Sequence, residues 1–535
     1  MSSYSDSFIQ KSLPPQELWP AIKLDNFQLP ENLNSAEVFL DKHCTTGKGD
    51  DICFYGSAGA WTYKKMQESA NQIAQVLIND LGLEPGNRVL LRSANNPMLV
   101  ACWFGVIKAG GIVVTTMPLL RAKELNDIVQ LGEIDFALCD ERLKEEMLQV
   151  QPRDVKTLLF DGLEVNGSEL EAKMNGKANQ FINYASKADD VALIGFTSGT
   201  TGIPKMTAHF HRDLVNICRS FPEYSLEMNA QDVVIGSPPI GFTFGLGGLV
   251  LFPMYYGAKG VLLEKPSPEL LLQAIQEHGV SICFTAPTAW KMLCTKWSEF
   301  SITSLRKCVS AGETLPAQVW EDWFNTTGLK IIDGIGATEM LHIFISSQES
   351  NLKPGATGVA IPGYEAKVVD KNGKELPRGK EGKLAVRGIT GCRYLNREEK
   401  QREYVQNGWN ITGDVFFQDE EGYFHYVARG DDMIISSGYN IAAISVENVL
   451  LGHPGILETA VVGEDDLDRG KVVAAYIVLK EGVEGSEVKK KEIQDWFKQV
   501  AAPYKYPRRI YFLSELPKTQ TGKLQRYKLK KTQAI

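Results

Sequence analysis

The stretch FTSGTTGIPK, residues 196–205, follows directly on the apolar run VALIGF at residues 191–196. A short apolar run followed by glycines and hydroxyl residues predicts a buried strand that ends in a tight turn. The crowded backbone N–H groups, the hydroxyls and the ammonium of Lys205 favour a phosphate-binding loop over a plain flexible loop. The spacing differs from the Walker pattern, and GIGATE at residues 334–339 fails the G-x-G-x-x-G pattern at its last position. The loop therefore indicates a nucleotide-binding protein of a third kind.

Short apolar runs rich in Val and Ile recur around this loop and alternate with helical patterns. They are RVLLRS (88–93), GIVVTT (111–116), FALCD (136–140), TLLF (157–160), VVIGS (233–237), GVLLE (260–264), SICFTA (281–286) and KCVSAG (307–312). Such an alternation predicts parallel sheets covered on both faces, whose ligands bind at the carboxyl ends of the strands. The phosphate-loop candidate, SAGE (310–313) and DGIGATE (333–339) all follow apolar runs. We therefore expect these three segments to converge on one cleft.

The pattern of the chain changes after about residue 360. Turns such as DKNGKE (370–375) and QDEEGY (418–423) separate short strands and predict an antiparallel β element over about residues 361–428. From about residue 430 the chain has its own strands, at 459–464 and 472–479, its own helix and a basic tail. We therefore predict an α/β fold with two domains. Residues 1–429 form a large domain of doubly wound sheets plus a small β-barrel-like element, and residues 430–535 form a small mobile α+β domain.

Length, charge and cysteine usage narrow the class of protein. The 535 residues are too many for one hydrophobic core, and 44% hydrophobic with 23% charged residues is ordinary for a globular enzyme. A net charge of −8 without a basic stripe argues against nucleic-acid binding. The N-terminus lacks a secretory pattern, and the uncharged stretch 233–258 holds too many glycines and prolines for a membrane span. Nine dispersed cysteines without a C-x-x-C pair favour reduced thiols in a cytoplasmic protein.

Five motifs resemble, in order and spacing, those of the adenylate-forming superfamily, which includes acyl- and aryl-CoA synthetases, firefly luciferase and the adenylation domains of peptide synthetases. They are TSGTTGIPK (197–205), GIGATE (334–339), TGD (412–414), RGDD (429–432) and PKTQTGK (517–523). The stretches LPPQELWP, NNPMLVACW, SAGETLP and DGIGATEMLHIFIS are more similar to those of benzoate- and 2-aminobenzoate-CoA ligases. The resemblance implies that ATP and a carboxylic acid form an acyl-AMP and pyrophosphate, after which the thiol of coenzyme A displaces AMP.

The resemblance also implies a role for each nucleotide-binding residue. The β- and γ-phosphates would be bound by Thr197, Ser198, Gly199, Thr200, Thr201, Gly202 and Lys205. Thr338 would contact the α-phosphate, and Glu339 would bind Mg²⁺, a cation for which one or two carboxylates suffice. Asp414 would accept hydrogen bonds from both ribose hydroxyls, with Arg429 beside ribose or phosphate. The adenine would lie near Ala311, Gly312, Glu313, Asp333, Gly334, Ile335 and Gly336.

Three residues of the C-terminal segment match positions that serve the two half-reactions. Lys523 resembles the family's catalytic lysine, which holds the acid carboxylate and the α-phosphate during adenylation. Asp431 matches the hinge about which the small domain rotates between the two steps. Gly438 would face the pantetheine tunnel, where a side chain would obstruct the thiol. On the residues alone, a lysine in a basic tail is equally a solvated surface group.

The acid itself is expected to bind near PPIGFTFGLG, where aromatic residues and glycines suit a flat apolar acid. The candidate pocket residues are Phe242, Phe244, Gly245, Ala286, Ala337, His342 and Ile343. His342 is placed to reach the carboxylate or an ortho substituent, or else to be a core histidine bonded to the backbone. No aspartate stands in IGFTFG to bind an α-ammonium group, which argues against α-amino acids. His209 and His211 lack accompanying carboxylates or cysteines, so we expect them to pack or cap a helix and not to bind zinc.

The leading interpretation is an ATP-dependent aryl-CoA ligase for an acid such as 2-aminobenzoate or benzoate. A ligase for short or medium aliphatic acids and an adenylating enzyme that loads a carrier protein are the alternatives, since Gly245, Gly247 and Gly248 leave room for either kind of acid. A degenerate nucleotide-binding protein is the non-enzymatic alternative, against which the intact motifs stand. The expected co-substrates and cofactor are ATP, coenzyme A and Mg²⁺, and the sequence leaves both a monomer and a homodimer open.

Overall fold

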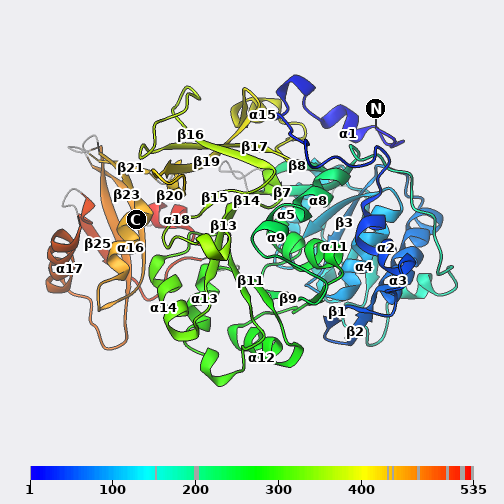
Figure 1. Ribbon diagram of the computed structural model, residues 1–535, viewed down its shortest axis with the longest axis horizontal. Helices are drawn as coiled ribbons and strands as arrows, with labels where there is room; N and C mark the ends of the chain where they lie inside the picture. Colours follow the sequence, from blue (N-terminus) through cyan, green and yellow to red (C-terminus); the bar gives the residue numbers. More distant parts are fainter. Residues whose placement is uncertain are drawn as a thin grey trace. The chain divides into compact units, whose positions relative to one another are not determined.

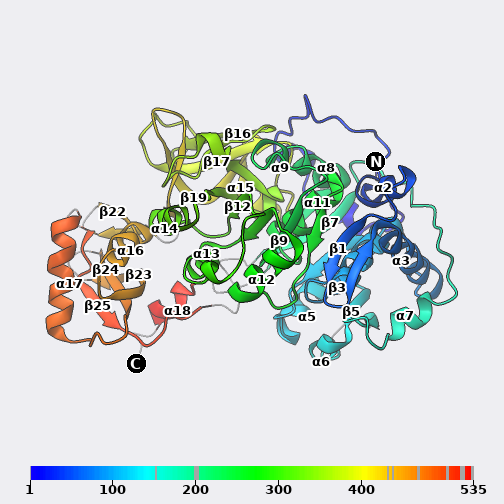
Figure 2. The ribbon, with the colours of Figure 1, turned by 60° about the horizontal axis from the view of Figure 1, so that its bottom comes forward.

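The computed structural model describes residues 2–150, 154–197, 204–430, 433–436, 439–466, 470–501, 505–518 and 524–531 (Figures 1 and 2). The chain divides into two compact units, one of Met1–Ala366 with Val386–Ile411 and the other of Lys367–Ala385 with Thr412–Ile535. Each unit combines sheets with covering helices, so the predicted α/β fold with a large and a small part is confirmed. The domain boundary predicted after residue 429 stays a prediction.

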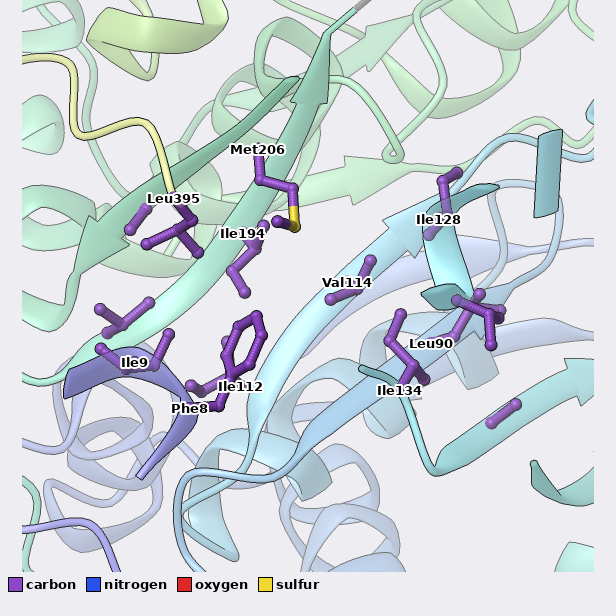
Figure 3. Packing of buried hydrophobic residues seen from close by; sticks show 14 of the residues in the cluster. Phe8, Ile9, Leu90, Ile112, Val114, Ile128, Ile134, Ile194, Met206 and Leu395 are labelled. Atoms are coloured by element: carbon purple, nitrogen blue, oxygen red, sulfur yellow. The ribbon is translucent and has the colours of Figure 1, made fainter. Parts of the chain in front are cut away.

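The first sheet of the larger unit has six strands in the order β6-β5-β3-β4-β7-β8. Their bounds are β3 Arg88–Arg92, β4 Ile112–Thr116, β5 Phe136–Asp140, β6 Lys156–Phe160, β7 Val191–Thr197 and β8 Lys205–Phe210. Neighbours from β6 to β7 run parallel, and β8 returns antiparallel to β7. Figure 3 shows apolar side chains of β3, β4, β7 and β8 packed with Phe8 and Ile9 of the N-terminal helix α1. The apolar runs predicted as strands from residues 88 to 196 are therefore confirmed.

The second sheet of this unit has nine strands in the order β15-β14-β13-β12-β11-β9-β10-β1-β2. Their bounds are β1 Ile52–Gly56, β2 Gly59–Thr62, β9 Val233–Gly236, β10 Lys259–Val261, β11 Ile282–Thr285, β12 Lys307–Ser310, β13 Ile331–Gly336, β14 Ile343–Ser346 and β15 Val359–Ala360. Neighbours from β13 to β1 run parallel, while β14, β15 and β2 are antiparallel additions. Trp290 and Trp323, from helices on one face, are fully buried in the core of this sheet.

The helices of the larger unit cover these sheets and begin at recognisable signals. Asn96 accepts a hydrogen bond from the backbone N–H of Leu99 at 2.9 Å, and Pro97 takes the first position of α4. The helices are α1 Phe8–Ser12, α2 Lys42–Thr45, α3 Tyr63–Gln75, α4 Pro97–Lys108, α5 Ala122–Leu131, α6 Lys144–Met147, α7 Glu169–Met174, α8 His211–Cys218, α9 Phe221–Tyr224, α10 Thr243–Leu246, α11 Phe252–Tyr256, α12 Pro268–His278, α13 Pro287–Leu293, α14 Ala317–Thr327 and α15 Glu398–Tyr404.

The uncharged stretch at residues 233–258 forms no single helix. It is divided into β9, a loop, the short helix α10, the π-type helix η5 (Gly247–Leu251) and α11. The strand β9 is the one expected from VVIGS (233–237). Among the helices in the described part of the chain, none is long and apolar enough to cross a membrane.

The smaller unit is built on a sheet in the order β22-β21-β24-β23, with β25 beside β24. Its bounds are β21 Met433–Ser436, β22 Tyr439–Ala442, β23 Ile456–Asp466, β24 Gly470–Leu479 and β25 Arg509–Phe512, with helices α16 Ala443–Leu451, α17 Glu487–Val500 and α18 Arg526–Lys531. Residues such as Val446, Val473 and Phe497 form its own core. The β element predicted at about residues 361–428 is a five-stranded sheet of β16 Tyr364–Val369, β17 Gly382–Gly388, β18 Val405–Gln406, β19 Trp409–Gln418 and β20 Phe424–Arg429.

Candidate functional site

The phosphate-loop candidate begins at the end of β7 and ends at the start of β8. Thr197 at the end of β7 pairs with Lys205 at the start of β8, so both lie at the carboxyl edge of the parallel strands. The hydroxyl of Thr197 is buried and has no hydrogen-bond partner among the described residues. The residues between them that were predicted to bind phosphate lie outside the described residues: Ser198, Gly199, Thr200, Thr201 and Gly202.

Lys205 and Glu339 lie together around a tyrosine that the sequence did not single out. The Lys205 Nζ is 2.8 Å from the Tyr394 hydroxyl, which in turn donates to Glu339 Oε1 at 2.5 Å. Lys205 Nζ and Glu339 Oε1 are 3.8 Å apart. Tyr394 is 1% exposed, and its burial, followed by the charge of Glu339, raises its pKa far above the ordinary range. The phenol therefore stays protonated and links an acid to a base.

Thr338 contacts both strands that flank the phosphate-loop candidate, β7 and β8. The Nε2 of His209 donates to the Thr338 carbonyl at 2.8 Å, since a carbonyl oxygen only accepts. Burial lowers the pKa of His209 to about 4, so the ring is neutral at physiological pH. Gly195 allows the Thr338 methyl group to approach β7, because a Cβ at Gly195 would lie 2.7 Å from that methyl carbon. His209 and His211 are both fully buried, which confirms the prediction that they pack inside the fold.

The residues predicted to surround adenine come from two neighbouring parallel strands. Ala311, Gly312 and Glu313 follow β12, while residues 333–336 end β13, and Ser310 pairs with Asp333. Gly312 has a φ of +89°, a left-handed conformation that favours glycine. The Oδ1 of Asp333 is buried without a hydrogen-bond partner among the described residues. This burial raises the pKa of Asp333 to about 7.

A small hollow lies beside Thr338 and the loop after β9. Of the predicted residues, Phe242 and Thr338 line it, together with Thr115, Leu193, Ile194, Gly195, Phe196, Ile240, Gly241, Thr243 and Leu246. The six other predicted pocket residues do not line this hollow: Phe244, Gly245, Ala286, Ala337, His342 and Ile343. The lining combines apolar side chains with the hydroxyls of three threonines, Thr115, Thr243 and Thr338.

His342 is surrounded by a cage of aromatic rings and lies next to Gly247, the first residue of η5. Its ring centroid is 4.6 Å from that of Phe252 and 5.7 Å from those of Phe221 and Phe244. The ring interacts with the backbone of Phe244, and neither ring nitrogen has a further hydrogen-bond partner of good geometry among the described residues. Burial lowers the pKa of His342 to about 3, which keeps the ring neutral. Both expectations for His342, a contact with the acid and a core histidine bonded to the backbone, therefore stay predictions.

Glycines let three of the pocket candidates, His342, Gly245 and Ile343, pack closely against neighbouring residues. A Cβ at Gly247 would lie 2.3 Å from His342 Cδ2, and one at Gly245 would lie 2.1 Å from the Pro239 carbonyl oxygen. Ile343 packs on Gly334, where a Cβ would lie 2.9 Å from its Cδ1. Ala337 immediately precedes the 3₁₀ turn Thr338–Met340, and Ala286 is the residue before α13. The sequence had named neither the contact with Gly247 nor the cage residues Phe221 and Phe252.

Asn95 fixes the loop that carries Phe242. Its Nδ2 donates to the Pro238 carbonyl at 3.0 Å, and its Oδ1 accepts from the Ile240 backbone N–H at 2.8 Å. Asn95 is 5% exposed. One amide side chain therefore clamps the loop on both sides of Pro239, a role that no local sequence signal reveals.

The smaller unit contains the predicted ribose-binding pair. Asp414 in β19 is paired with Arg429 in β20, and Arg429 Nη1 lies 3.3 Å from Asp414 Oδ1. Asp414 is 9% exposed, whereas half of the Arg429 side chain is exposed. Gly413 leaves room for the guanidinium group, which a Cβ there would meet at 3.1 Å. The predicted hinge residue Asp431, the tunnel residue Gly438 and the catalytic Lys523 lie outside the described residues.

Comparison with known proteins extends these observations over nearly the whole chain. The model of the AMP-binding enzyme family matches residues 40–393, and that of the AMP-binding enzyme C-terminal domain matches residues 445–523. The chain is 33% identical to the benzoate–CoA ligase of Thauera aromatica, across 96% of this chain and 97% of that protein. It is 30% identical to the mitochondrial acyl-coenzyme A synthetase ACSM3 of Pongo abelii, across 94% of this chain and 90% of that protein. The crystal structure of the anthranilate CoA ligase AuaEII with anthranoyl-AMP superimposes with a TM-score of 0.87 at 31% identity, covering 94% and 98% of the two chains.

Proposed function

We propose that the acid activated by this protein is aromatic. The chain belongs to the AMP-binding enzyme family, and it is an acid–CoA ligase that works through an acyl adenylate. ATP and coenzyme A are its co-substrates. The observation that carries the proposal is the cage of Phe221, Phe244 and Phe252 around His342, which packs on Gly247, the residue after Leu246 in the lining of the hollow. Two of the relatives named above are ligases of benzoate and anthranilate, and we propose one of these acids, benzoate or 2-aminobenzoate, as the substrate.

The adenylation step needs charge on phosphates to be neutralised more than it needs covalent help from the protein. A carboxylate is a poor electrophile until AMP replaces hydroxide as its leaving group. Lys205 and the loop from Thr197 to Gly202 would bind the β- and γ-phosphates, and Thr338 the α-phosphate, so that the acid carboxylate attacks in line. Asp414 and Arg429 would hold the ribose, and the segments 311–313 and 333–336 the adenine.

Glu339 has the properties of a ligand for the Mg²⁺ that accompanies ATP. Its Oε1 accepts from Tyr394, while its Oε2 has no hydrogen-bond partner in the described part of the chain. A single carboxylate oxygen beside a triphosphate is the kind of donor that this hard cation takes. Bound there, Mg²⁺ would offset the charge of the phosphate oxygens. The role of this chain is to present one oxygen of Glu339 and to keep Lys205 beside it.

His342 is proposed as the group that distinguishes one aromatic acid from another. As a neutral imidazole it offers one N–H donor and one acceptor nitrogen, and the Phe244 backbone engages at most one of them, so the other has no partner among the described residues. An ortho amino group or the carboxylate of the acid would complete these bonds. A buried group built to bond a substrate polar atom discriminates strongly against analogues that lack it.

The second step is proposed to use the C-terminal residues that the family resemblance identified. Lys523 would serve adenylation, Asp431 the rotation of the small domain, and Gly438 the passage of the pantetheine thiol. These assignments rest on motif position alone, because the three residues lie outside the described part of the chain.

The proposal is tested by pyrophosphate release with Mg·ATP across benzoate, 2-aminobenzoate, phenylacetate, acetate and hexanoate, each with and without coenzyme A. We expect sustained turnover with an aromatic acid, dependent on coenzyme A. Preference for acetate or hexanoate would overturn the pocket assignment and leave the adenylation chemistry in place. Turnover only with a carrier protein in place of coenzyme A would overturn the ligase assignment.

A further inference from the structure

We propose that Tyr394 is a positioning residue that holds Lys205 and Glu339 together as one binding unit for a metal-complexed triphosphate. The inference rests on the proposed function, because it assumes that these two side chains bind phosphate and cation. It goes beyond that function by naming the residue that sets their distance and leaves one carboxylate oxygen available.

The hydrogen-bonding capacity of the three groups fixes the direction of each bond. A carboxylate only accepts and an ammonium only donates, whereas a phenol does both at once. The Tyr394 hydroxyl therefore donates a hydrogen bond to Glu339 Oε1 at 2.5 Å and accepts one from Lys205 Nζ at 2.8 Å. With the hydroxyl between them, the charged atoms stay 3.8 Å apart. The Lys205 ammonium also lies 4.6 Å from the centre of the tyrosine ring.

The backbone, and not the two charged partners, fixes the position of Tyr394. The segment around it pairs with β8, through an antiparallel bridge between Thr207 and Tyr394 and through Leu395 N–H to the Met206 carbonyl at 3.0 Å. Side chains two residues apart on a strand share a face, so Lys205 and Thr207 both face the side on which Tyr394 lies. The buried Gln401 accepts from the Tyr394 backbone N–H at 2.8 Å.

A hydroxyl held in this way changes what happens before the nucleotide arrives. Without it, an ammonium and a carboxylate in a half-buried site would close into a direct ion pair. Each would then neutralise the other, and both would have to separate again to bind phosphate and cation. The tyrosine keeps Lys205 and Glu339 as a long ion pair of 3.8 Å without a direct hydrogen bond, which lowers the cost of that reorganisation.

The substitution Tyr394→Phe tests this role because it removes only the hydroxyl. We expect the dissociation constant of Mg·ATP, measured by isothermal titration calorimetry, to rise roughly 10-fold or more, the usual effect of losing a hydrogen bond to a charged group. The dissociation constant of AMP, which lacks the β- and γ-phosphates, should change less than about twofold. Tyr63→Phe is the matched control, since Tyr63 is fully buried and its hydroxyl donates to the remote Ala258 carbonyl at 3.2 Å.

A double-mutant cycle separates positioning from general support of the fold. If Tyr394 acts through Glu339, then Glu339→Gln combined with Tyr394→Phe should bind Mg·ATP no more weakly than Glu339→Gln alone. A merely structural tyrosine would weaken both backgrounds equally, and that result would overturn the inference. Equal Mg·ATP affinity in Tyr394→Phe and Tyr63→Phe, with Glu339→Gln impaired, would also overturn it while leaving the proposed function intact. Unchanged Mg·ATP binding in Lys205→Ala and Glu339→Gln would instead overturn the proposed function on which it rests.

Discussion

Gly247→Ala tests the acid site through a contact that only the structure reveals. A Cβ at this position would lie 2.3 Å from Cδ2 and 2.8 Å from Nε2 of His342. Ordinary carbon contacts are about 3.5–4.0 Å, so the imidazole must move by about 1 Å or more. Phe221, Phe244 and Phe252 surround the ring, and His342 is 2% exposed. The displaced ring therefore has little free room inside this cage.

The size of the effect follows from the cost of overpacking a rigid core. Inserting a methyl group into a close-packed site costs about 1–3 kcal/mol, which corresponds to roughly 5- to 150-fold in an equilibrium. If His342 contacts the acid, this cost falls on acid binding. We therefore expect the KM for the acid to rise within that range, with the KM for ATP changed less than about twofold.

The assay is steady-state thioester formation with the acid and ATP varied in turn. Gly105→Ala is the matched control, because its Cβ would lie 2.6 Å from Ile73 Cγ2 in the packing between α3 and α4, remote from the site. Both variants should lower the unfolding temperature, but only Gly247→Ala should raise the KM of the acid. An unchanged KM for the acid in Gly247→Ala, with a loss of stability like that of Gly105→Ala, would refute the assignment of His342 to the acid site.

Three further substitutions test other parts of the site. Because burial raises the pKa of Asp333 from 3.8 to about 7, the folded protein keeps a proton between about pH 4 and 7 that the unfolded chain releases, so stability falls as pH rises through this window. Asp333→Asn should remove that slope, which amounts to about 3 kcal/mol between pH 5 and pH 8 in denaturant titrations, and a parallel dependence in wild type and variant would count against it. Asn95→Ala frees the loop at Pro238 and Ile240, so the acid KM should rise several-fold at constant ATP KM; a change in the ATP KM alone would contradict this. Lys523→Ala should abolish acyl-AMP formation and spare thioester formation from supplied acyl-AMP, and equal loss of both half-reactions would show the assignment to be wrong.

Much of the fold could be predicted because burial on both faces of a parallel strand leaves a readable signal. Runs such as RVLLRS and FALCD are apolar throughout, and the structure turns each into a strand, β3 and β5. The sequence likewise predicted that Lys205, Thr338 and Glu339 lie in one region, because their motifs follow apolar runs and loops after parallel strands meet at the same edge of a sheet.

Contacts made across the chain left no such signal. Tyr394 lies 189 residues from Lys205, and it reaches that lysine only because its segment pairs with β8. Gly247 and His342 meet in the same way, through a helix turn packed on the residue before β14. The sequence showed which glycines and aromatic residues were available, but their close approach depends on tertiary packing.

Whether the enzyme activates an aromatic acid through its adenylate can be measured by a competition in one vessel. Benzoate, 2-aminobenzoate and hexanoate at equal concentrations are incubated with enzyme, Mg·ATP and coenzyme A, and the thioesters are counted by mass spectrometry at low conversion. Because the product ratio equals the ratio of kcat/KM values, no separate binding measurement is needed. We expect aromatic thioesters to exceed hexanoyl-CoA, and we expect the matching aroyl-AMP to accumulate when coenzyme A is omitted. Predominance of hexanoyl-CoA would contradict this expectation.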